Sequence, residues 1–294
     1  MVAGPSLSTR TRRSWSRGVS LAVTAAFTLV ALSGCSFSDV FAFGWPEGIT
    51  PQAERMYDMW VGSVIAALVV GVFVWGLIFW CVVRYRKRGS ELPPQTRYNL
   101  PLEILYTVAP FLVIAVLFYY TAIIQSYVDE TSEDPDVTVE VVGFQWNWEF
   151  IYTGTEGPDG EPISTLGTDD YIPVLVLPAN RTVQFIETSP DVIHSFWVPE
   201  LLFKRDVIPG YENRFEVTLQ EEGAYVGRCA ELCGTYHAQM NFELRVVSWE
   251  EYQQFLELRA EGASTPEALE AIGEEPYAVT TRPFDTERDS REAS

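Results

Sequence analysis

The stretch VTVEVVGFQWNWEFIY, residues 137–152, begins with strictly alternating apolar and polar side chains and is rich in β-branched and aromatic residues. Both features are typical of a half-buried β-strand, because successive side chains of a strand point to opposite faces of its sheet. We read two strands in this stretch, and eight short strands in all predict an all-β sandwich or small barrel. The other six, separated by turns rich in Gly, Pro, Asn and Asp, are IPVLVL, RTVQFIE, VIHSFWV, RFEVTL, AYVGRC and FELRVV.

The segments that interrupt or follow these strands have different compositions. Residues 153–170 are rich in Gly, Thr, Asp and Pro and are predicted to form a long loop. A helix is predicted from Trp249 to about Leu258. Ser264 and Glu267 have the spacing of a capping box and predict the start of another helix. The last twenty residues are polar and charged, which predicts disorder.

Two long apolar runs precede the strands. Residues 59–83 contain no charged side chain, and residues 104–124 form the second run. Each is long enough to cross the hydrocarbon of a bilayer, which takes about 20 residues. Pro110 lies inside the second run, where a membrane-spanning helix tolerates it. The sequence therefore predicts a transmembrane hairpin.

The loop between the runs, residues 84–103, carries five basic residues, with Glu91 its only acid before Glu103. By the positive-inside rule this loop is cytoplasmic. Residues 35–58 and the strand-rich domain, residues 126–258, are then expected on the extracytoplasmic side. Residues 259–294 are predicted to be an acidic C-terminal extension.

The N-terminus has the pattern of a targeting segment. Four arginines between residues 10 and 17 precede a short apolar run, residues 19–32. The run ends at Leu-Ser-Gly-Cys, which resembles a bacterial lipobox. We therefore predict a lipoprotein signal peptide over residues 1–34 and a lipid anchor on Cys35 in the bacterial cell membrane, with an ordinary signal peptide as the alternative.

Charge is distributed unevenly along the chain. Of the 40 acidic residues, 34 follow Gln125, together with only 10 of the 20 basic residues. Such an acidic domain would repel phosphates, which argues against binding nucleic acid. It could attract a basic partner, although an acidic surface also simply keeps a protein soluble.

The segment CAELCGTYHAQM, residues 229–240, gathers two cysteines, a histidine and a methionine. The chain has one other histidine, His194. Cys229 and Cys233 could form a disulfide outside the cytoplasm, but a bridge across this short loop would be strained and would leave the neighbouring ligands unexplained. A core histidine and a gap-filling methionine are plausible for each residue alone. Their clustering favours a metal site.

Thiolate, imidazole and thioether are soft ligands that favour copper over cations preferring oxygen. Zinc could use two Cys and two His but would leave Met240 without a role. A blue-copper site needs one Cys, two His and a weak Met, so the second Cys is in excess. Two thiolates can bridge two copper ions, each with one histidine, while Met240 and a backbone carbonyl complete the two ends. Such a pair shares an electron with little change in bond lengths.

The loop CAELCGTYHAQM, the segment DVIHSFWVPEL around His194 and DVIPG at 206–210 together resemble the subunit II family of haem–copper cytochrome c oxidases. The family pattern Cys-x-Glu-x-Cys-Gly-x-x-His-x-x-Met is met at every fixed position. The resemblance spans residues 45–258 and implies a two-helix transmembrane hairpin followed by an all-β, cupredoxin-like Greek-key domain. Ala230 and Asn241 replace the usual Ser and Pro, and neither is a ligand.

The resemblance also implies roles for particular residues. Trp146 falls on the tryptophan that receives electrons from the donor haem. Glu103 falls on the glutamate at the mouth of a proton channel, although a snorkelling residue near the membrane boundary explains it as well. The Glu231 side chain would bind magnesium at the contact with subunit I. Asp191 and Asp206 fall near the donor-docking face, where a solvated surface is an equal explanation. The ligands of the dinuclear copper centre fall on His194, Cys229, the carbonyl of Glu231, Cys233, His237 and Met240.

The implied protein is the electron-accepting subunit of a terminal respiratory oxidase, of an actinobacterial or other Gram-positive type. A c-type cytochrome, soluble or tethered in a supercomplex, would reduce the copper pair, which passes electrons to haem in subunit I, where oxygen becomes water and protons are pumped. Subunit III is a further expected partner. A membrane-anchored copper chaperone or assembly protein is the alternative, although it would need neither Met240 nor the Trp-rich strand. A metal-free quinol-oxidase subunit would lack the cysteines, and a nitrous oxide reductase would need a histidine-rich propeller.

Overall fold

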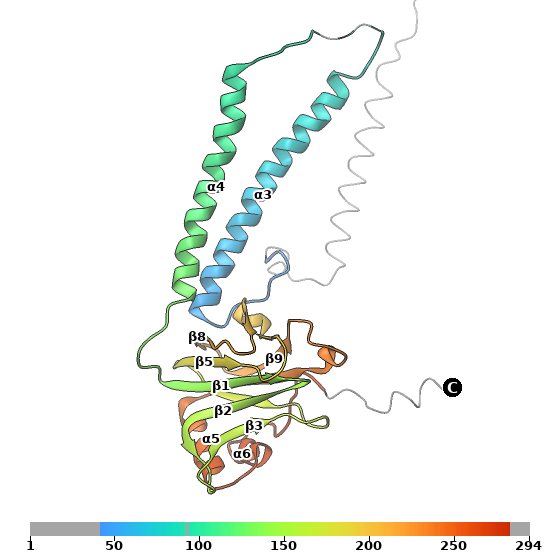
Figure 1. Ribbon diagram of the computed structural model, residues 1–294. Helices are drawn as coiled ribbons and strands as arrows, with labels where there is room; N and C mark the ends of the chain where they lie inside the picture. The colour runs from blue at the N-terminus through green and yellow to red at the C-terminus, as the bar shows by residue number, and fades with distance from the viewer. Residues whose placement is uncertain (1–41, 91, 93, 283–294) are drawn as a thin grey trace, which may run out of the picture. The chain divides into compact units, whose positions relative to one another are not determined.

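The computed structural model describes residues 42–90, 92 and 94–282. In that part of the chain, two long helices precede a β-domain that ends in two short helices (Figure 1). The predicted signal segment, residues 1–34, and Cys35 lie outside the described residues, and so do residues 283–294 of the end predicted to be disordered.

Helix α3 spans Pro51–Arg84 and helix α4 spans Leu100–Val128. Thr50 and Asn99 cap their first turns, since each side-chain oxygen accepts a backbone N–H of the helix. Pro110 lies inside α4 without ending it. The two helices run antiparallel as a hairpin (Figure 1).

The surfaces of both helices are strongly apolar. Val72 is 75% exposed and Phe73 is 65% exposed, which would be unfavourable in water. Both helices are long and apolar enough to cross a membrane, as the sequence predicts. They extend beyond the apolar runs 59–83 and 104–124 at both ends, because their first and last turns also contain polar residues.

The β-domain is a sandwich of two five-stranded sheets, so the predicted sandwich is confirmed. Most neighbouring strands are antiparallel, but β1 pairs with β5, and β4 with β10, in parallel. The order in one sheet is β3 (Pro162–Leu166), β2 (Asn147–Glu156), β1 (Val137–Phe144), β5 (Thr182–Thr188) and β8 (Asn213–Thr218). The order in the other sheet is β4 (Val174–Pro178), β10 (Asn241–Val247), β9 (Gly223–Cys229), β6 (His194–Trp197) and β7 (Lys204–Val207).

The core lies between the two sheets. In β1, alternate residues from Val137 to Val141 are buried, as the period of a strand requires. Both sheets also contribute aromatic rings that pack against one another, which adds to the stabilisation from apolar burial. The stacked ring pairs are Phe185 with Phe215, at 4.6 Å between centroids, and Phe196 with Phe242, at 4.7 Å.

Two strands were not predicted from the sequence. The predicted loop 153–170 is wrong in part, because it contains the end of β2 and all of β3. Strand β3 is held by Arg259, whose guanidinium donates to the carbonyl of Ser164 at 2.6 Å. Strand β7 is the sequence Lys-Arg-Asp-Val, and its charged side chains are tolerated because it is an edge strand.

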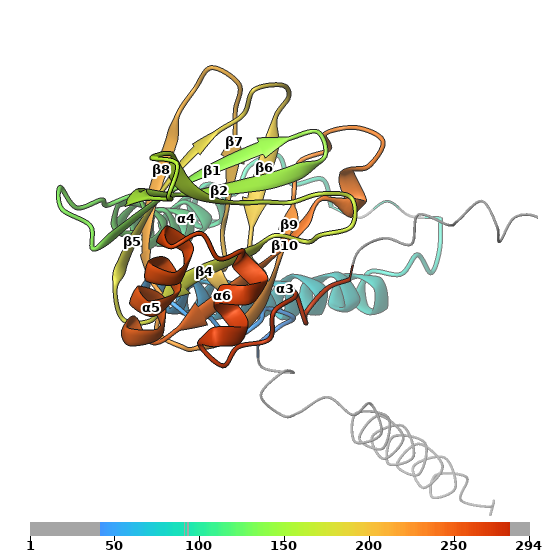
Figure 2. The same ribbon diagram turned by 90° about the horizontal axis from the view of Figure 1, so that it is seen from below.

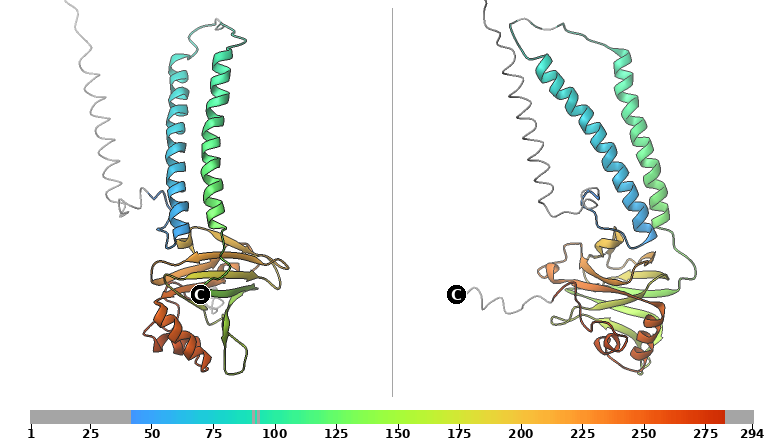
Figure 3. Two further views of the ribbon diagram at one scale, coloured as in Figure 1. Left: turned by 90° about the vertical axis from the view of Figure 1, so that its left-hand side faces the viewer. Right: turned by 180° about the vertical axis from the view of Figure 1, so that it is seen from behind.

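Helices α5 (Trp249–Ala260) and α6 (Thr265–Ala271) follow the last strand, close to their predicted positions. Each begins with a capping box, formed by Ser248 with Glu251 and by Ser264 with Glu267. Helix α5 contacts β4 and β2, and both views of Figure 3 show the two helices against the sandwich. Seen from below, α5 lies beside β4, and α6 lies next to α5 (Figure 2). Two short 3₁₀ helices, η1 (Pro199–Leu201) and η2 (His237–Gln239), interrupt the connections.

Candidate metal centre

Three adjacent strands bring the predicted ligands together. His194 is the first residue of β6, Cys229 is the last residue of β9, and Met240 immediately precedes β10. Since β10, β9 and β6 are neighbours in one sheet, these strand ends lie together at one end of the sheet. Two backbone hydrogen bonds fix the meeting point. Cys229 N donates to Met240 O at 3.0 Å, and Ala230 N donates to Ser195 O at 2.9 Å.

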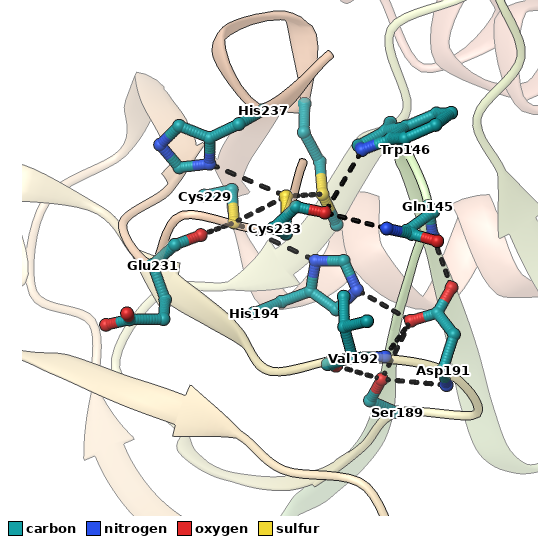
Figure 4. A network of polar contacts seen from close by, with 11 residues as sticks. Gln145, Trp146, Ser189, Asp191, Val192, His194, Cys229, Glu231, Cys233 and His237 are labelled. Atoms are coloured by element: carbon teal, nitrogen blue, oxygen red, sulfur yellow. Dashed lines mark hydrogen bonds and ion pairs between the residues drawn. The ribbon is translucent and has the colours of Figure 1, made fainter. Parts of the chain in front are cut away.

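The soft donor atoms form a compact group (Figure 4). Sγ of Cys229 and Sγ of Cys233 are 3.8 Å apart, and both thiols are free. A disulfide would place these atoms about 2.05 Å apart, so the strained-bridge alternative does not describe this structure. The two sulfurs face each other at a separation at which metal ions could lie between them.

Each sulfur has its own histidine and its own third neighbour. Sγ of Cys229 is 3.9 Å from Nδ1 of His194 and 3.3 Å from the carbonyl oxygen of Glu231. Sγ of Cys233 is 3.5 Å from Nδ1 of His237 and 3.9 Å from Sδ of Met240. The donors thus form two similar halves, each with one imidazole and one weaker donor.

The group is largely shielded from water. His194, Cys229, Cys233 and Met240 are buried, whereas His237 is half-buried. The possible metal-binding atoms of His194, Cys229 and Cys233 lie within 4.8 Å of one another. Sulfur and imidazole donors in this proportion fit copper better than cations that prefer oxygen.

The two thiols differ in acidity. Burial disfavours the thiolate of Cys229, but hydrogen bonds with His194 and with the backbone of Glu231 outweigh burial and lower its pKa to about 7. Burial and the adjacent Cys229 raise the pKa of Cys233 to about 12. One thiolate therefore forms readily, and the second forms when a bound cation compensates its charge.

Asp191 holds the buried histidine in position. Its Oδ1 lies 2.9 Å from Nε2 of His194, which leaves Nδ1 facing Cys229. The same carboxylate accepts the backbone N–H of Gln145 at 2.7 Å and of Val192 at 2.6 Å. Burial opposes ionisation of Asp191, but these hydrogen bonds, that of His194 first, lower its pKa.

Trp146 lies against the same loop. Its Nε1 donates to the carbonyl of Cys233 at 3.3 Å, and Nε2 of Gln145 donates to that carbonyl at 2.8 Å. Gly234 makes this approach possible, because a Cβ there would lie 3.0 Å from Nε1 of Trp146. The sequence did not predict the roles of Gln145 and Gly234, although a glycine beside a ligand was a signal of close backbone approach.

The other predicted site residues lie apart from this group. Glu103 is in the first turn of α4, where its carboxylate accepts the backbone N–H of Asn99 at 3.0 Å. The side chain of Glu231 is exposed and points away from the sulfurs, whereas its carbonyl points toward them (Figure 4). Asp206 is on β7 and pairs with Lys204 at 2.8 Å.

Comparisons with known proteins identify the relatives of this chain. Residues 137–247 match the family described as cytochrome c oxidase subunit II, periplasmic domain, and residues 38–123 match cytochrome c oxidase subunit II, transmembrane domain. A probable cytochrome c oxidase subunit 2 from Nocardia farcinica is 44% identical, with 95% of this chain and 90% of the relative covered. Cytochrome c oxidase subunit 2 of Mycobacterium tuberculosis is 42% identical, with 92% and 90% covered.

Among solved structures, the periplasmic domain of subunit II of cytochrome oxidase (CoxB) from Bradyrhizobium japonicum is similar at 30% identity and a TM-score of 0.38. The match covers 43% of this chain and 95% of that domain.

Proposed function

Because the chain belongs to the family of cytochrome c oxidase subunit II, we propose that its cluster of soft donors holds a pair of copper ions. The chain is the electron-accepting subunit of a membrane oxidase, and the His and Cys donors of its β-domain fit copper. A shared copper pair, when bound, takes up and releases one electron with little change in its bond lengths. The proposed ligands are His194, Cys229, the carbonyl of Glu231, Cys233, His237 and Met240.

The single observation that carries this proposal is the division of the donors into two halves. Two sulfurs 3.8 Å apart each have a histidine nitrogen within 3.9 Å. Met240 then belongs to the Cys233 half and the Glu231 carbonyl to the Cys229 half. A single zinc or blue-copper ion would leave part of this set unused.

The surrounding residues keep the donors fixed, which electron transfer without rearrangement requires. Asp191 orients His194 through Nε2, and the hydrogen bond between Cys229 N and Met240 O ties the two ends of the loop. Trp148 is fully buried behind the site and donates from Nε1 to Met240 O at 3.3 Å. These contacts hold His194, Cys229 and Met240 in the positions from which they would bind the metal.

Trp146 is proposed as the residue through which electrons reach the site. Its ring is half-buried, and its Nε1 donates one hydrogen bond to the carbonyl of Cys233. From that carbonyl, only the covalent bonds within Cys233 lead to the ligand sulfur. The donor is proposed to be a c-type cytochrome, soluble or tethered in a supercomplex, and the acidic domain would attract its basic face.

The exposed side of the ligand loop is proposed to face the partner that receives the electron. Leu232, between two proposed ligands, is 79% exposed, and the Glu231 carboxylate beside it is free to bind magnesium at the contact with subunit I. The chain belongs within a haem–copper oxidase complex, and subunits I and III are its proposed neighbours.

The chain is a membrane protein with a β-domain outside the membrane. We keep as proposals the lipid anchor on Cys35 and the role of Glu103 at the mouth of a proton channel. The capping contact of Glu103 with Asn99 is compatible with a position at the end of α4.

Copper content tests the proposal. We expect two copper ions per chain in the purified protein, and loss of most copper in Cys233→Ser because both proposed copper ions would bind that sulfur. Cys81→Ser is the matched control, since Cys81 is a free, exposed cysteine in α3 and should not affect copper content. One copper per chain that passes readily to a competing chelator would instead indicate the copper-chaperone alternative.

A further inference from the structure

A second aromatic side chain lies on Trp146. The ring of Tyr236 meets the ring of Trp146 edge to face, with centroids 4.9 Å apart and an interplanar angle of 85°. This is a favourable geometry for an aromatic pair, because the positive edge of one ring meets the negative face of the other. The contact therefore adds to the hydrogen bond of Nε1 in holding the ring of Trp146.

Three features that help to position Trp146 come from one short part of the ligand loop. Cys233 accepts its Nε1–H, Gly234 leaves room for its ring, and Tyr236 packs against it. At Gly234 the backbone has φ of +128°, and an added Cβ would also lie 3.2 Å from Cζ2 of Trp146. The position of Trp146 therefore depends on the conformation of the loop that carries the ligands.

Tyr236 also connects Trp146 to a second proposed ligand, His237, in the same half of the donor set as Cys233. Tyr236 immediately precedes His237, whose Nδ1 lies 3.5 Å from Sγ of Cys233, and it caps the short helix η2 that contains this histidine. Trp146 is thus linked to two proposed ligands by different routes. Its hydrogen bond reaches Cys233 directly, and its ring contact reaches Tyr236, which is covalently bonded to His237.

The same tyrosine is accessible to a docking protein. Tyr236 is 47% exposed, and Trp146 is half-buried beside it. Trp146 also lines a small depression with Thr168, Asp169 and Gln239, so an acidic residue lies near the Trp146 side of the aromatic pair. An apolar contact bordered by an acid suits the haem edge of a basic c-type cytochrome.

We propose that Tyr236 is a second residue of electron uptake, which positions Trp146 and offers its own ring to the donor, an inference that rests on the proposed copper function. One electron would leave the ferrous haem of the donor, which would become ferric, and would reduce the copper pair that the loop is proposed to hold. No bond forms or breaks, and no proton moves. The hydroxyl of Tyr236 is not needed for this role, whereas its ring is.

The test is the rate of the first electron transfer into the complete oxidase from a photoreduced c-type cytochrome. We expect Tyr236→Leu to slow this step about tenfold, which corresponds to about 1.4 kcal/mol in the barrier. Tyr236→Phe should restore the rate, since it keeps the ring. Tyr277→Leu is the matched control, because Tyr277 is an exposed tyrosine in the C-terminal segment.

Two further readouts separate a role in electron uptake from a structural effect. The copper EPR spectrum and reduction potential should be unchanged in Tyr236→Leu, because the residue is not a ligand. In a Trp146→Leu background, Tyr236→Leu should slow the step further by much less than tenfold, because the two rings act together. Should the leucine variant not assemble, Tyr236→Gln replaces it in the same measurements.

An unchanged rate in the non-aromatic variants, or a changed EPR spectrum in them, would overturn the proposal for Tyr236. If the unmodified protein itself lacked the signal of a copper pair, the proposed copper function would fail instead, and the two failures are thus distinguishable.

Discussion

Asp191 shows how a single side chain can serve two segments of the site. Its carboxylate forms hydrogen bonds with Nε2 of His194 and with the backbone N–H of Gln145. Asp191 therefore links the buried ligand to the residue that precedes Trp146. The resemblance placed Asp191 near the donor-docking face, and its side chain is only 29% exposed. Its contacts favour a role in orienting the ligand.

We therefore expect Asp191→Asn to lower copper affinity by about 10- to 100-fold, the usual effect of losing a carboxylate that orients a metal-binding histidine. The absorption and EPR spectra of the bound copper should shift as well. Asp206→Asn is the control, because Asp206 pairs with Lys204 and not with a ligand. Unchanged spectra with a weaker, less salt-dependent interaction with cytochrome would instead identify Asp191 as a docking charge.

Glu187 is a buried acid outside the metal site. It is fully buried on β5, and neither carboxylate oxygen has a hydrogen-bond partner among the described residues. Burial raises its pKa well above the ordinary value of 4.5, Asp206 adds to the effect, and Arg205 opposes it. The folded protein therefore keeps a proton on Glu187 that the unfolded chain releases.

This difference predicts a pH-dependent gain in stability for Glu187→Gln. Since the folded pKa is raised, the native state binds more protons than the unfolded chain above pH 4.5, and stability falls as pH rises. The glutamine variant escapes this loss, so its advantage should grow to about 1–3 kcal/mol between weakly acidic and weakly alkaline pH. Thermal unfolding across this range measures the effect.

Glu212→Gln is the comparison for Glu187, because Glu212 is an exposed acid that pairs with Arg214. It should show no comparable gain. A stability difference for Glu187→Gln that stayed constant with pH would contradict the assignment of a protonated acid.

At the residue scale, spacing predicted the ligand loop because five of the six proposed ligands lie within twelve positions. The contacts of Asp191 and Gly234 could not be predicted in the same way. The contacts of Asp191 depend on the turn after β1 meeting the segment before β6, and the contact of Gly234 depends on the same turn meeting the ligand loop. No short sequence pattern encodes either meeting.

Among the elements, β10 carries a charged pair on the face that turns away from the core. Glu243 and Arg245 are buried and paired with each other. Glu243 also accepts the backbone N–H groups of Val279 and Thr280 at 2.7 and 2.8 Å, and Arg245 donates to Glu274 at 2.8 Å. The described end of the acidic extension is thus bound to the strand that follows Met240.

Breaking this pair should release the C-terminal segment. We expect Glu243→Gln to lower the free energy of unfolding by about 3 kcal/mol, because one partner of a buried ion pair is lost. Residues 272–282 should then be cut faster in limited proteolysis. Glu140→Gln, at an exposed position of β1, should change neither measurement by a comparable amount. Continued protection of the segment in Glu243→Gln would show that other contacts hold it.

Patterns of alternation predicted eight strands but missed β3 and β7. Strand β3 is short and lies among turn-forming residues, and β7 has one buried residue among its four. Both pair at the edge of a sheet, so tertiary hydrogen bonds rather than local sequence define them.

For the whole molecule, the division into a membrane hairpin and a β-domain was evident from hydropathy, because the bilayer imposes a length that the sequence must meet. The prediction of disorder for the last twenty residues is wrong for the part that the structure describes, since residues within 275–280 form hydrogen bonds with β10. Composition could not reveal this contact, which depends on a buried pair in another element.

The EPR spectrum of the oxidised copper centre in the assembled oxidase tests the central claim most directly. If Cys229 and Cys233 bridge two copper ions, the unpaired electron is shared, and hyperfine splitting should come equally from two copper nuclei. Splitting from one copper nucleus, a silent zinc site, or a disulfide between the two cysteines would contradict the account.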